Sequence, residues 1–155
     1  NRNINIIVGT EFEELRPDWD RAWWNLKTAC DKDIPSDTPF EEIPFEEGRH
    51  YLEEPFCNRA HALIAVEGLN PVGILNLGTV DKGIINLNYT GVAASHRRQG
   101  VSLAMKVQCF ELAKSLGAHT ISTQNHSHNP MLSLNKHLGF QERDAIVFFK
   151  RRIHE

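Results

Sequence analysis

One stretch of the chain, residues 84–106, constrains the fold more than any other, because it joins an apolar segment to a helix through a basic turn. Residues 84–92 are largely apolar and predict a strand. The next apolar side chains recur at steps of three and four, at Leu103, Val107, Phe110, Ala113 and Leu116, which predicts a helix. Between the two lies Arg97-Arg98-Gln99-Gly100. The sequence therefore predicts a strand, a tight cationic loop and a helix N-terminus, in that order.

This order of elements favours the binding of phosphate. The first amide groups of a helix have no intrahelical acceptor, and the helix dipole favours an anion beside them. Gly100 lets the backbone approach a bulky ligand, Ser102 is small, and the two arginines add positive charge. Hydrogen bonds to a charged group contribute about 1.5–3 kcal/mol each, so several together can hold a pyrophosphate.

The loop resembles a motif of the GNAT family of N-acetyltransferases. Residues 97–102 resemble the family's R-x-x-G-x-G/A loop, with Ser102 in the place where Gly or Ala is usual. Residues 90–92 resemble the end of the preceding strand, and residues 129–140, which end in Leu-Gly-Phe, resemble the second motif of the family. The resemblance covers residues 60–150, and it implies that the loop amides hold the pyrophosphate of coenzyme A.

The resemblance also implies which residues bind the cofactor, acetyl-CoA. In the family, main-chain groups at the end of the strand before the loop pair with the pantetheine arm, a role that falls here on Val92 and its neighbours. The side chain of Val92 is equally compatible with the core. The expected cofactor-binding residues come from the strand end, the loop and the second motif: Val92, Arg97, Arg98, Gln99, Gly100, Val101, Ser102, Leu103, Asn129 and Asn135.

Transfer of an acyl group from a thioester to an amine needs three things: loss of a proton from the acceptor, a donor for the developing oxyanion, and departure of a thiolate. The family often places a tyrosine three residues before the Leu of Leu-Gly-Phe, and this chain has Asn135 there. An asparagine cannot act as a general acid, so either the thiolate leaves unaided or another group serves. Asn135 could hydrogen-bond the cofactor or be a polar residue of the helix surface.

The identity of the base is open. Residues 84–92 include Tyr89 but no carboxylate, which leaves Glu67, the acidic segment described below and the histidines at 126 and 128. Asn125, at the end of a predicted strand, is expected to face the cleft. The candidate catalytic residues are therefore Asn125, Tyr89 and Asn135. Two histidines at i and i+2 without a third ligand make a poor metal site, so no metal is expected.

Composition bounds the class of protein. A chain of 155 residues with 41% hydrophobic residues is expected to form one domain, over residues 1–155, with a real core. The longest apolar run is too short for a membrane helix, and the net charge of −3 argues against nucleic acid. Three scattered cysteines favour free thiols and a cytoplasmic location. The missing initiator Met suggests trimming or excision from a longer or tandem protein, and a homodimer is left open.

The charge is unevenly distributed along the chain. Residues 31–54, here named the acidic segment, hold nine carboxylates and two basic side chains, so their net charge is −7 and that of the remainder is +4. Four prolines within or beside this segment exclude a continuous helix or a central strand. We expect a long loop with one helical turn near residues 46–52. The loop could border the site of a cationic acceptor or be a solvated connector.

The remaining elements predict the fold. We expect strands over residues 4–9, 60–67, 72–80, 84–92, 119–124 and 145–150. Helices are expected over residues 18–30, with Trp19, Trp23 and Leu26 on one face, over 103–116, and from Asn129 and Pro130 to 138. Short turns between the middle strands imply an antiparallel meander. The fold class is α/β (α+β), GNAT-like: a mixed, mostly antiparallel sheet flanked by helices. The resemblance implies that strands 84–92 and 119–124 run parallel and splay apart to admit the pantetheine arm.

The sequence thus predicts an N-acetyltransferase that moves an acetyl group from acetyl-CoA to a primary amine, expected to be a small cationic molecule. The alternative is a non-catalytic module that binds coenzyme A, as one half of a tandem protein. The replacement of the family's tyrosine by Asn135 and the missing Met lend this alternative some weight, and turnover with a panel of amines separates the two.

Overall fold

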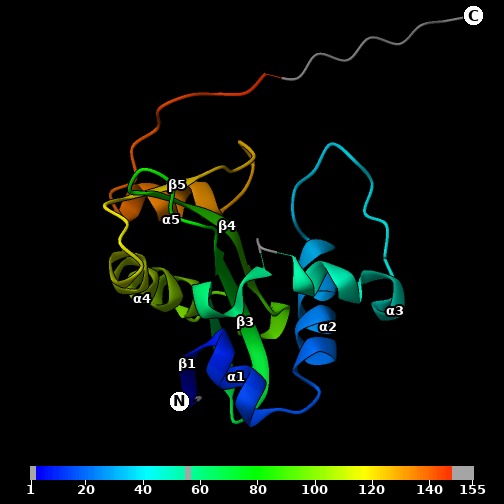
Figure 1. Ribbon diagram of the computed structural model, residues 1–155. Coiled ribbons are helices and arrows are strands. Elements are labelled where there is room, and N and C mark those ends of the chain that lie inside the picture. The colour runs from blue at the N-terminus through cyan, green and yellow to red at the C-terminus, as the bar shows by residue number, and fades with distance from the viewer. Residues whose placement is uncertain (1–2, 55–56, 148–155) are drawn as a thin grey trace, which may run out of the picture.

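The centre of the molecule is a five-stranded sheet with the strand order β1-β2-β3-β4-β5. The computed structural model describes residues 3–54 and 57–147 of the chain (Figure 1). The first four strands, β1 (Ile4–Val8), β2 (Ala62–Glu67), β3 (Asn70–Leu77) and β4 (Ile84–Val92), pair antiparallel. The last strand, β5 (Thr120–Thr123), pairs parallel with β4. The predicted mixed sheet is therefore confirmed.

Chain connections explain these directions. A two-residue turn joins β2 to β3 and a short loop joins β3 to β4, and such links permit only antiparallel neighbours. A parallel neighbour needs a crossover, which here is α4 (Val101–Ser115). The antiparallel meander and the crossover helix both agree with the sequence prediction.

Helices cover both faces of the sheet. In Figure 1, α4 lies on one side of the sheet, and α2 (Trp19–Asp31) with α3 (Phe45–Gly48) lies on the other. Alternate residues of β2 supply the two cores, since Leu63 packs in the cluster with α4 and Ile64 in the cluster with α2. The remaining helical elements are short: α1 (Gly9–Leu15), η1 (Arg49–Glu53), η3 (Arg59–His61), η4 (Ala94–His96) and α5 (Met131–His137).

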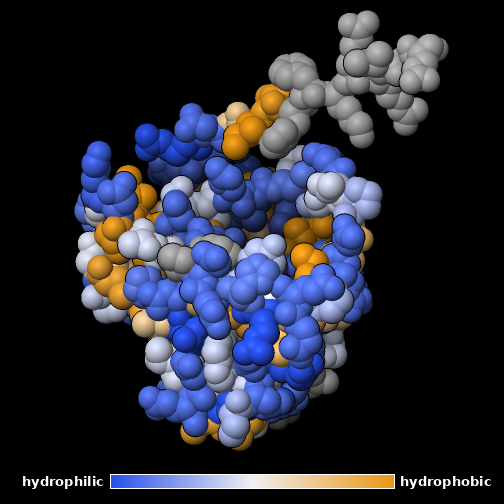
Figure 2. Space-filling model, turned by 45° about the vertical axis from the view of Figure 1, so that its right-hand side comes forward, coloured by the Kyte–Doolittle hydropathy of each residue, from blue (hydrophilic) through white to orange (hydrophobic). Residues whose placement is uncertain are grey.

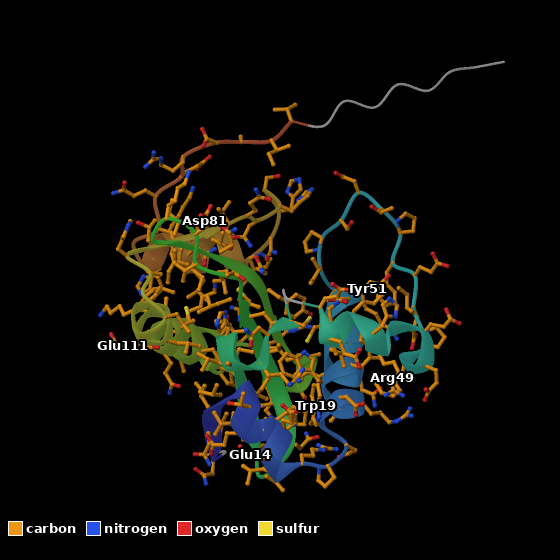
Figure 3. The ribbon with its side chains drawn as sticks, viewed as in Figure 1. Glu14, Trp19, Arg49, Tyr51, Asp81 and Glu111 are labelled. Atoms are coloured by element: carbon orange, nitrogen blue, oxygen red, sulfur yellow. The ribbon has the colours of Figure 1, made fainter. Side chains whose placement is uncertain are left out.

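The predicted face of α2 is confirmed, and the helix is anchored by aromatic contacts. Trp23 is buried, and the ring of Trp19 meets it edge-on at 6.1 Å between centroids (Trp19 is labelled in Figure 3). The guanidinium of Arg59 lies 4.5 Å from the centroid of Trp19. Trp24 is also buried, and its indole N–H donates to the carbonyl oxygen of Ile43 at 3.1 Å. This bond ties the acidic segment to α2.

The predicted helix is confirmed as α4, but the apolar row that predicted it is exposed in its first half. Leu103 and Val107 are 37% and 50% exposed, whereas the helix buries Val101, Met105, Lys106, Cys109 and Ala113. Apolar residues of α4 occur on several sides of the helix, so their periodicity alone does not say which row meets the sheet. Contact with Leu75, Leu77 and other residues of the β2–β4 face selects the row at steps of four.

Two further predictions differ from the structure. Helix α1 was not predicted from the sequence, and its first residue, Gly9, falls within the predicted first strand. The predicted last strand, residues 145–150, is not formed over 145–147, and the rest of it lies outside the described residues. The predicted helical turn within the acidic segment is present as α3 and η1.

The described residues also show the state of the cysteines, the lengths of the apolar helices and the polarity of one surface. Cys30, Cys57 and Cys109 are all buried free thiols. Within residues 3–54 and 57–147, no helix combines the length and apolarity needed to cross a bilayer. The surface over α2 and α3 is mainly hydrophilic, with separate apolar groups among the polar ones (Figure 2).

Because the thiol of Cys109 is buried, the stability of the fold should decrease at alkaline pH. Burial raises its pKa to about 11 from 9.0. A folded-state pKa above the unfolded value contributes stability that is complete below pH 9 and is lost as pH rises through 11. The free energy of unfolding should therefore be about 2 kcal/mol lower at pH 11 than below pH 9, since one pKa unit corresponds to about 1.4 kcal/mol.

Urea unfolding at pH 8 and pH 11 checks this expectation. Cys109→Ala should show a smaller loss of stability between the two pH values than the unsubstituted chain. The control is Met105→Leu, a buried substitution on the same helix that removes no titrating group and should keep the full loss. Equal losses in all three proteins would contradict the role given to Cys109.

Candidate active site

A pocket of about 850 Å³ lies where β4 and β5 separate, bordered by α4, α5 and the beginning of the acidic segment. Most of the predicted site residues line it: Tyr89, Val92, Arg97, Arg98, Gly100, Val101, Ser102, Leu103, Asn125 and Asn129. Gln99 and Asn135 are not among the lining residues. The structure thus brings the predicted loop and the predicted strand ends together in one cavity.

The pocket begins where the parallel pairing stops. Pairing of β4 with β5 runs from Ile84 and Thr120 to Leu87 and Thr123, and the Thr123 hydroxyl donates to the Leu87 carbonyl oxygen at 3.1 Å. Beyond this point β4 continues to Val92 beside β3, whereas the chain after Thr123 turns away toward α5. The second half of β4 therefore faces the pocket instead of a neighbouring strand.

The predicted phosphate loop forms a turn that ends at Gly100. This glycine has φ +81°, and a Cβ placed on it would meet open space. The Ala104 amide donates to the Gly100 carbonyl oxygen at 2.9 Å, so the amides of residues 101–103 precede the first bond of the helix. These donors, at the start of a fifteen-residue helix that borders the pocket, fit a pyrophosphate group.

Arg97 connects the loop to the rest of the site. Its Nε donates to the Val92 carbonyl oxygen at 2.9 Å, and its terminal nitrogen pairs with Asp33 at 2.7 Å. The Arg97 guanidinium is therefore engaged with protein groups, whereas Arg98 is exposed at the pocket edge. Gln99 points elsewhere, since its side chain donates to the Ser95 carbonyl oxygen at 3.0 Å.

Cys30 also borders the pocket and is 2% exposed. Burial raises the pKa of this thiol to about 11, with nearby Arg97 acting in the opposite direction. The thiol is therefore protonated at neutral pH. A protonated, buried thiol is a poor nucleophile, so Cys30 contributes to the wall of the pocket.

Tyr89 points from β4 toward α2. Its hydroxyl donates to an Asp31 carboxylate oxygen at 2.9 Å, and Asp31 is paired in turn with Lys27 at 2.5 Å. Burial, and next the Asp31 charge, raise the pKa of Tyr89 above its ordinary value. The phenol is therefore neutral, and its proton is directed at Asp31.

A polar chain crosses from α4 to the end of β5. The ammonium of Lys106 donates to Oδ1 of Asn135 at 2.6 Å, and Nδ2 of Asn135 donates to Oδ1 of Asn125, also at 2.6 Å. Lys106 is 2% exposed and Asn135 is 3% exposed. Burial lowers the pKa of Lys106. The predicted residues Asn125 and Asn135 are thus joined to a lysine that sequence reasoning missed.

The candidate bases fall into two groups. Glu67 accepts from Nε2 of His96 at 3.2 Å, and the buried His96 lines the pocket. His126 lies 3.9 Å from Asp37, its ring is 5.3 Å from that of His128, and neither histidine lines the pocket. Over the described ranges, no cluster of three or more His, Cys, Asp or Glu side chains is arranged to hold a metal.

Lys106 and His96 are two of the polar pocket residues that were not predicted from the sequence. A signal for Lys106 was available: it lies between Met105 and Val107, in the mainly apolar first half of the helix. Nothing in the sequence distinguishes His96 from a surface histidine of the loop. Helix α5 begins one residue later than predicted, with Pro130 as its N-cap residue, and Oδ1 of Asn129 accepts from the amide of Met131 at 2.9 Å.

Comparison with known proteins agrees with this geometry. The sequence profile of the "Acetyltransferase (GNAT) family" matches residues 16–140, which is most of the chain. The chain belongs to the GNAT family. Its members are acetyltransferases, so the protein is an acetyl-CoA-dependent acyltransferase whose cofactor is acetyl-CoA.

Solved structures of GNAT proteins share the fold. A putative acetyltransferase from Pyrococcus furiosus is 19% identical with a TM-score of 0.71, over 96% of this chain and all of that one. The aminoglycoside N-acetyltransferase AAC(6')-Iy in complex with CoA is 17% identical with a TM-score of 0.65, over 97% and 95% of the two chains. An aminoglycoside acetyltransferase from an uncultured soil metagenomic sample, in complex with sisomicin, is 12% identical with a TM-score of 0.64, over 98% and 96%. No curated protein sequence matches the chain.

Replacing Gly100 tests the position of the cofactor. Gly100→Asp places a carboxylate where the Cβ meets open space at the loop, so it should repel the pyrophosphate and disturb the amides. We expect CoA affinity, measured by calorimetry, to fall at least about 100-fold, since two lost bonds to a charged group contribute about 1.5–3 kcal/mol each.

The matched control is Gly68→Asp, in the turn between β2 and β3. Gly68 also has a positive φ, +63°, with nothing within 4 Å of an added Cβ, and it does not line the pocket. It carries the same backbone strain and the same added charge, and it should bind CoA normally. Unchanged affinity in a folded Gly100→Asp protein would place the pyrophosphate elsewhere.

Proposed function

We propose that this GNAT protein transfers the acetyl group of acetyl-CoA to a primary amine of a small cationic molecule, by direct attack of the amine on the thioester. The acyl-CoA supplies the activated carbonyl and a thiolate leaving group of low basicity. The chain supplies the binding sites that hold the two reactants side by side, which converts a bimolecular encounter into an oriented reaction.

The observation that carries this proposal is the meeting of two oppositely charged walls at one pocket. The cationic loop and the first amides of α4 form one wall, and the acidic segment begins at the other with Asp33, Ile34 and Pro35. The ion pair of Arg97 with Asp33 joins the walls at 2.7 Å. An anionic cofactor and a cationic acceptor are therefore attracted to adjacent parts of the cavity.

The names of the structural neighbours support an amine acceptor. AAC(6')-Iy was solved with a bisubstrate analogue that links CoA to acetylneamine, and the soil enzyme was solved with sisomicin. Both are described as aminoglycoside acetyltransferases. Their identity to this chain is too low to transfer the acceptor itself, so aminoglycosides enter here as one member of a panel of cationic amines.

The direct test is a screen of acceptors that follows thiol release from acetyl-CoA and identifies the product by mass. The panel should include diamines, polyamines and aminoglycosides, and amino acids as amines that carry a carboxylate. All three cysteines are at most 4% exposed, so a thiol reagent should report mainly the CoA that is released. We expect turnover with cationic amines above that with amino acids. Binding of CoA without turnover on any amine would instead support the non-catalytic module.

The acidic segment should act on the acceptor through long-range attraction. Its exposed carboxylates include Glu42, which pairs with Lys32 at 3.1 Å, and Glu46, which pairs with Arg21 at 2.9 Å. Changing Glu41, Glu42, Glu46 and Glu47 together to glutamine should raise the KM of a cationic acceptor several-fold with little change in kcat. The effect should shrink as salt rises, because 0.1 M salt screens charges beyond about 10 Å.

A matched control removes four exposed carboxylates elsewhere. Glu11, Glu14, Glu111 and Glu142 lie outside the acidic segment, and their replacement by glutamine changes the net charge equally. If the effect is local, this protein keeps its KM. A KM that stays unaltered at low salt in the first protein would leave the acidic segment as a connector.

A further inference from the structure

Lys106 is a buried cation without an acidic partner. It is 2% exposed, and it lines the pocket from α4. Throughout the part of the chain that the structure describes, no carboxylate forms an ion pair with it, and its hydrogen bond goes to a neutral amide, Asn135. Burial of a charge is costly and usually requires compensation. A buried lysine without such compensation is therefore a candidate functional residue.

The lysine fixes the direction of the hydrogen bonds that follow it. An ammonium group is a donor only, so the Asn135 atom that meets it must be the oxygen. The Asn135 amide nitrogen then faces Asn125, whose oxygen accepts from it at 2.6 Å. The ammonium of Lys106 therefore fixes the orientation of both amides. As a result, the NH₂ group of Asn125 remains available as a donor.

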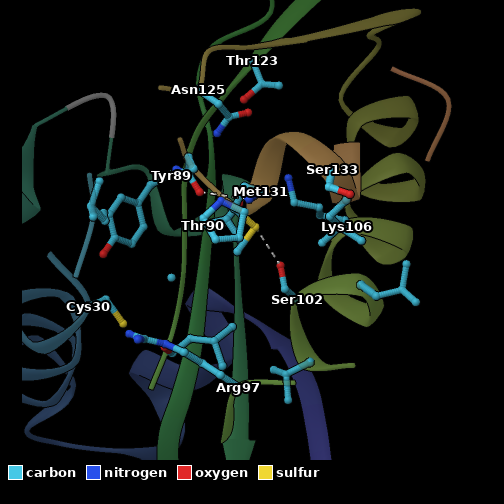
Figure 4. A pocket seen from close by; sticks show the side chains of 18 of the residues that line it. Cys30, Tyr89, Thr90, Arg97, Ser102, Lys106, Thr123, Asn125, Met131 and Ser133 are labelled. Carbon is cyan, nitrogen blue, oxygen red and sulfur yellow. Dashed lines mark hydrogen bonds between the residues drawn. The ribbon is translucent and has the colours of Figure 1, made fainter. Parts of the chain in front are cut away.

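Asn125 stands where the two parallel strands separate. It is two residues beyond Thr123, the last residue of β5 paired with β4, and it is exposed to the pocket. Figure 4 shows Thr123 and Asn125 at one end of the pocket and Ser102 with Arg97 at the other. A cofactor whose pyrophosphate lay at the phosphate loop would therefore extend toward Asn125, where the strands separate.

We propose that Lys106 is a positioning residue that acts through Asn135 to hold the NH₂ group of Asn125 toward the reacting thioester. This inference rests on the proposed acetyl transfer. During that reaction the amine nitrogen bonds to the carbonyl carbon, the C–S bond breaks with its electron pair on sulfur, and the proton of the acceptor passes to water. Lys106 keeps its protons throughout. Asn125 donates to the negative charge that develops, and the buried cation polarises both amides in the favourable sense.

This arrangement accounts for the absence of the tyrosine expected at position 135. A phenol would give a proton to the leaving group, whereas Asn135 transmits the field and orientation of Lys106 without a proton transfer. The thiolate then leaves as an anion in a site where a fixed donor and a nearby cation favour it. Lys106 contacts neither reactant in this scheme, so its role is positioning and not direct catalysis.

A structural role and a positioning role make opposite predictions for Lys106→Met. Methionine has a similar volume and no charge, and replacing a buried ion by an apolar side chain is often neutral or stabilising. If the lysine had only a structural role, kcat would change only when thermal stability changed with it. We expect the Lys106→Met protein to keep or raise its melting temperature and its affinity for CoA, while kcat falls about 10- to 100-fold.

Two independent readouts complete the experiment. The side-chain amide resonances of Asn125 and Asn135, observed by nitrogen-15 NMR, should shift in Lys106→Met, and the response of Asn125 to acetyl-CoA should be lost. Asn135→Ala should lower kcat to a similar degree with measurable activity left, and the double variant should be no worse than either single one. Lys114→Met, which removes an exposed lysine of the same helix, is the control for charge and should match the unsubstituted protein.

The possible failures are distinguishable. Unchanged kcat in a folded Lys106→Met protein would overturn this inference and leave acetyl transfer intact. Absence of turnover in the unsubstituted protein would overturn the proposed function, and the NMR response of Asn125 to acetyl-CoA would then decide the positioning role alone. If Lys106→Met does not fold, Asn125→Ala at its exposed position replaces it: kcat should fall by the same factor, and an unaltered kcat would overturn the proposal.

Discussion

The parallel pairing of β4 with β5 is four residue pairs long, and the whole site depends on where it ends. Up to Leu87 and Thr123 the two strands satisfy each other's main-chain groups. Beyond them, β4 runs on with a partner on one side only, and its backbone groups from residue 88 to 92 face a cavity. A strand edge of this kind favours an extended ligand that supplies the missing hydrogen bonds. The cavity and the exposed edge therefore arise from one interruption of the sheet.

Arg97 determines how the cavity is bordered. By binding the carbonyl oxygen of Val92 and the carboxylate of Asp33, it holds the end of β4, the cationic loop and the start of the acidic segment together. Ordering a long loop has an entropic cost, which the bond of Trp24 to Ile43 and the short helix α3 help to offset. The two oppositely charged walls are thereby held close together, while the acidic segment as a whole keeps its net negative charge.

The polar chain from Lys106 to Asn125 places a charged group in the core, which is unfavourable for stability. The same helix that contributes Met105 and Cys109 to the packing also buries a cation. An apolar side chain there would pack without the penalty of a buried charge. Natural sequences depart from the most stable choice mainly at functional sites, which is why the departure at Lys106 carries information that the well-packed residues around it do not.

Local signals in the sequence were sufficient for most of the fold. The apolar run at Ile84–Val92, the basic turn, Gly100 and the start of α5 next to Asn129 and Pro130 depend on neighbours along the chain, and each was predicted from them. The tertiary structure alone decided which row of α4 is buried, because apolar residues on several sides make its periodicity ambiguous until the sheet selects one. It alone joined Lys106 to Asn135 and Arg97 to Asp33, pairs separated by 29 and 64 residues. Contacts at such distances form only when strand order and helix packing bring the residues together, and no local pattern encodes them.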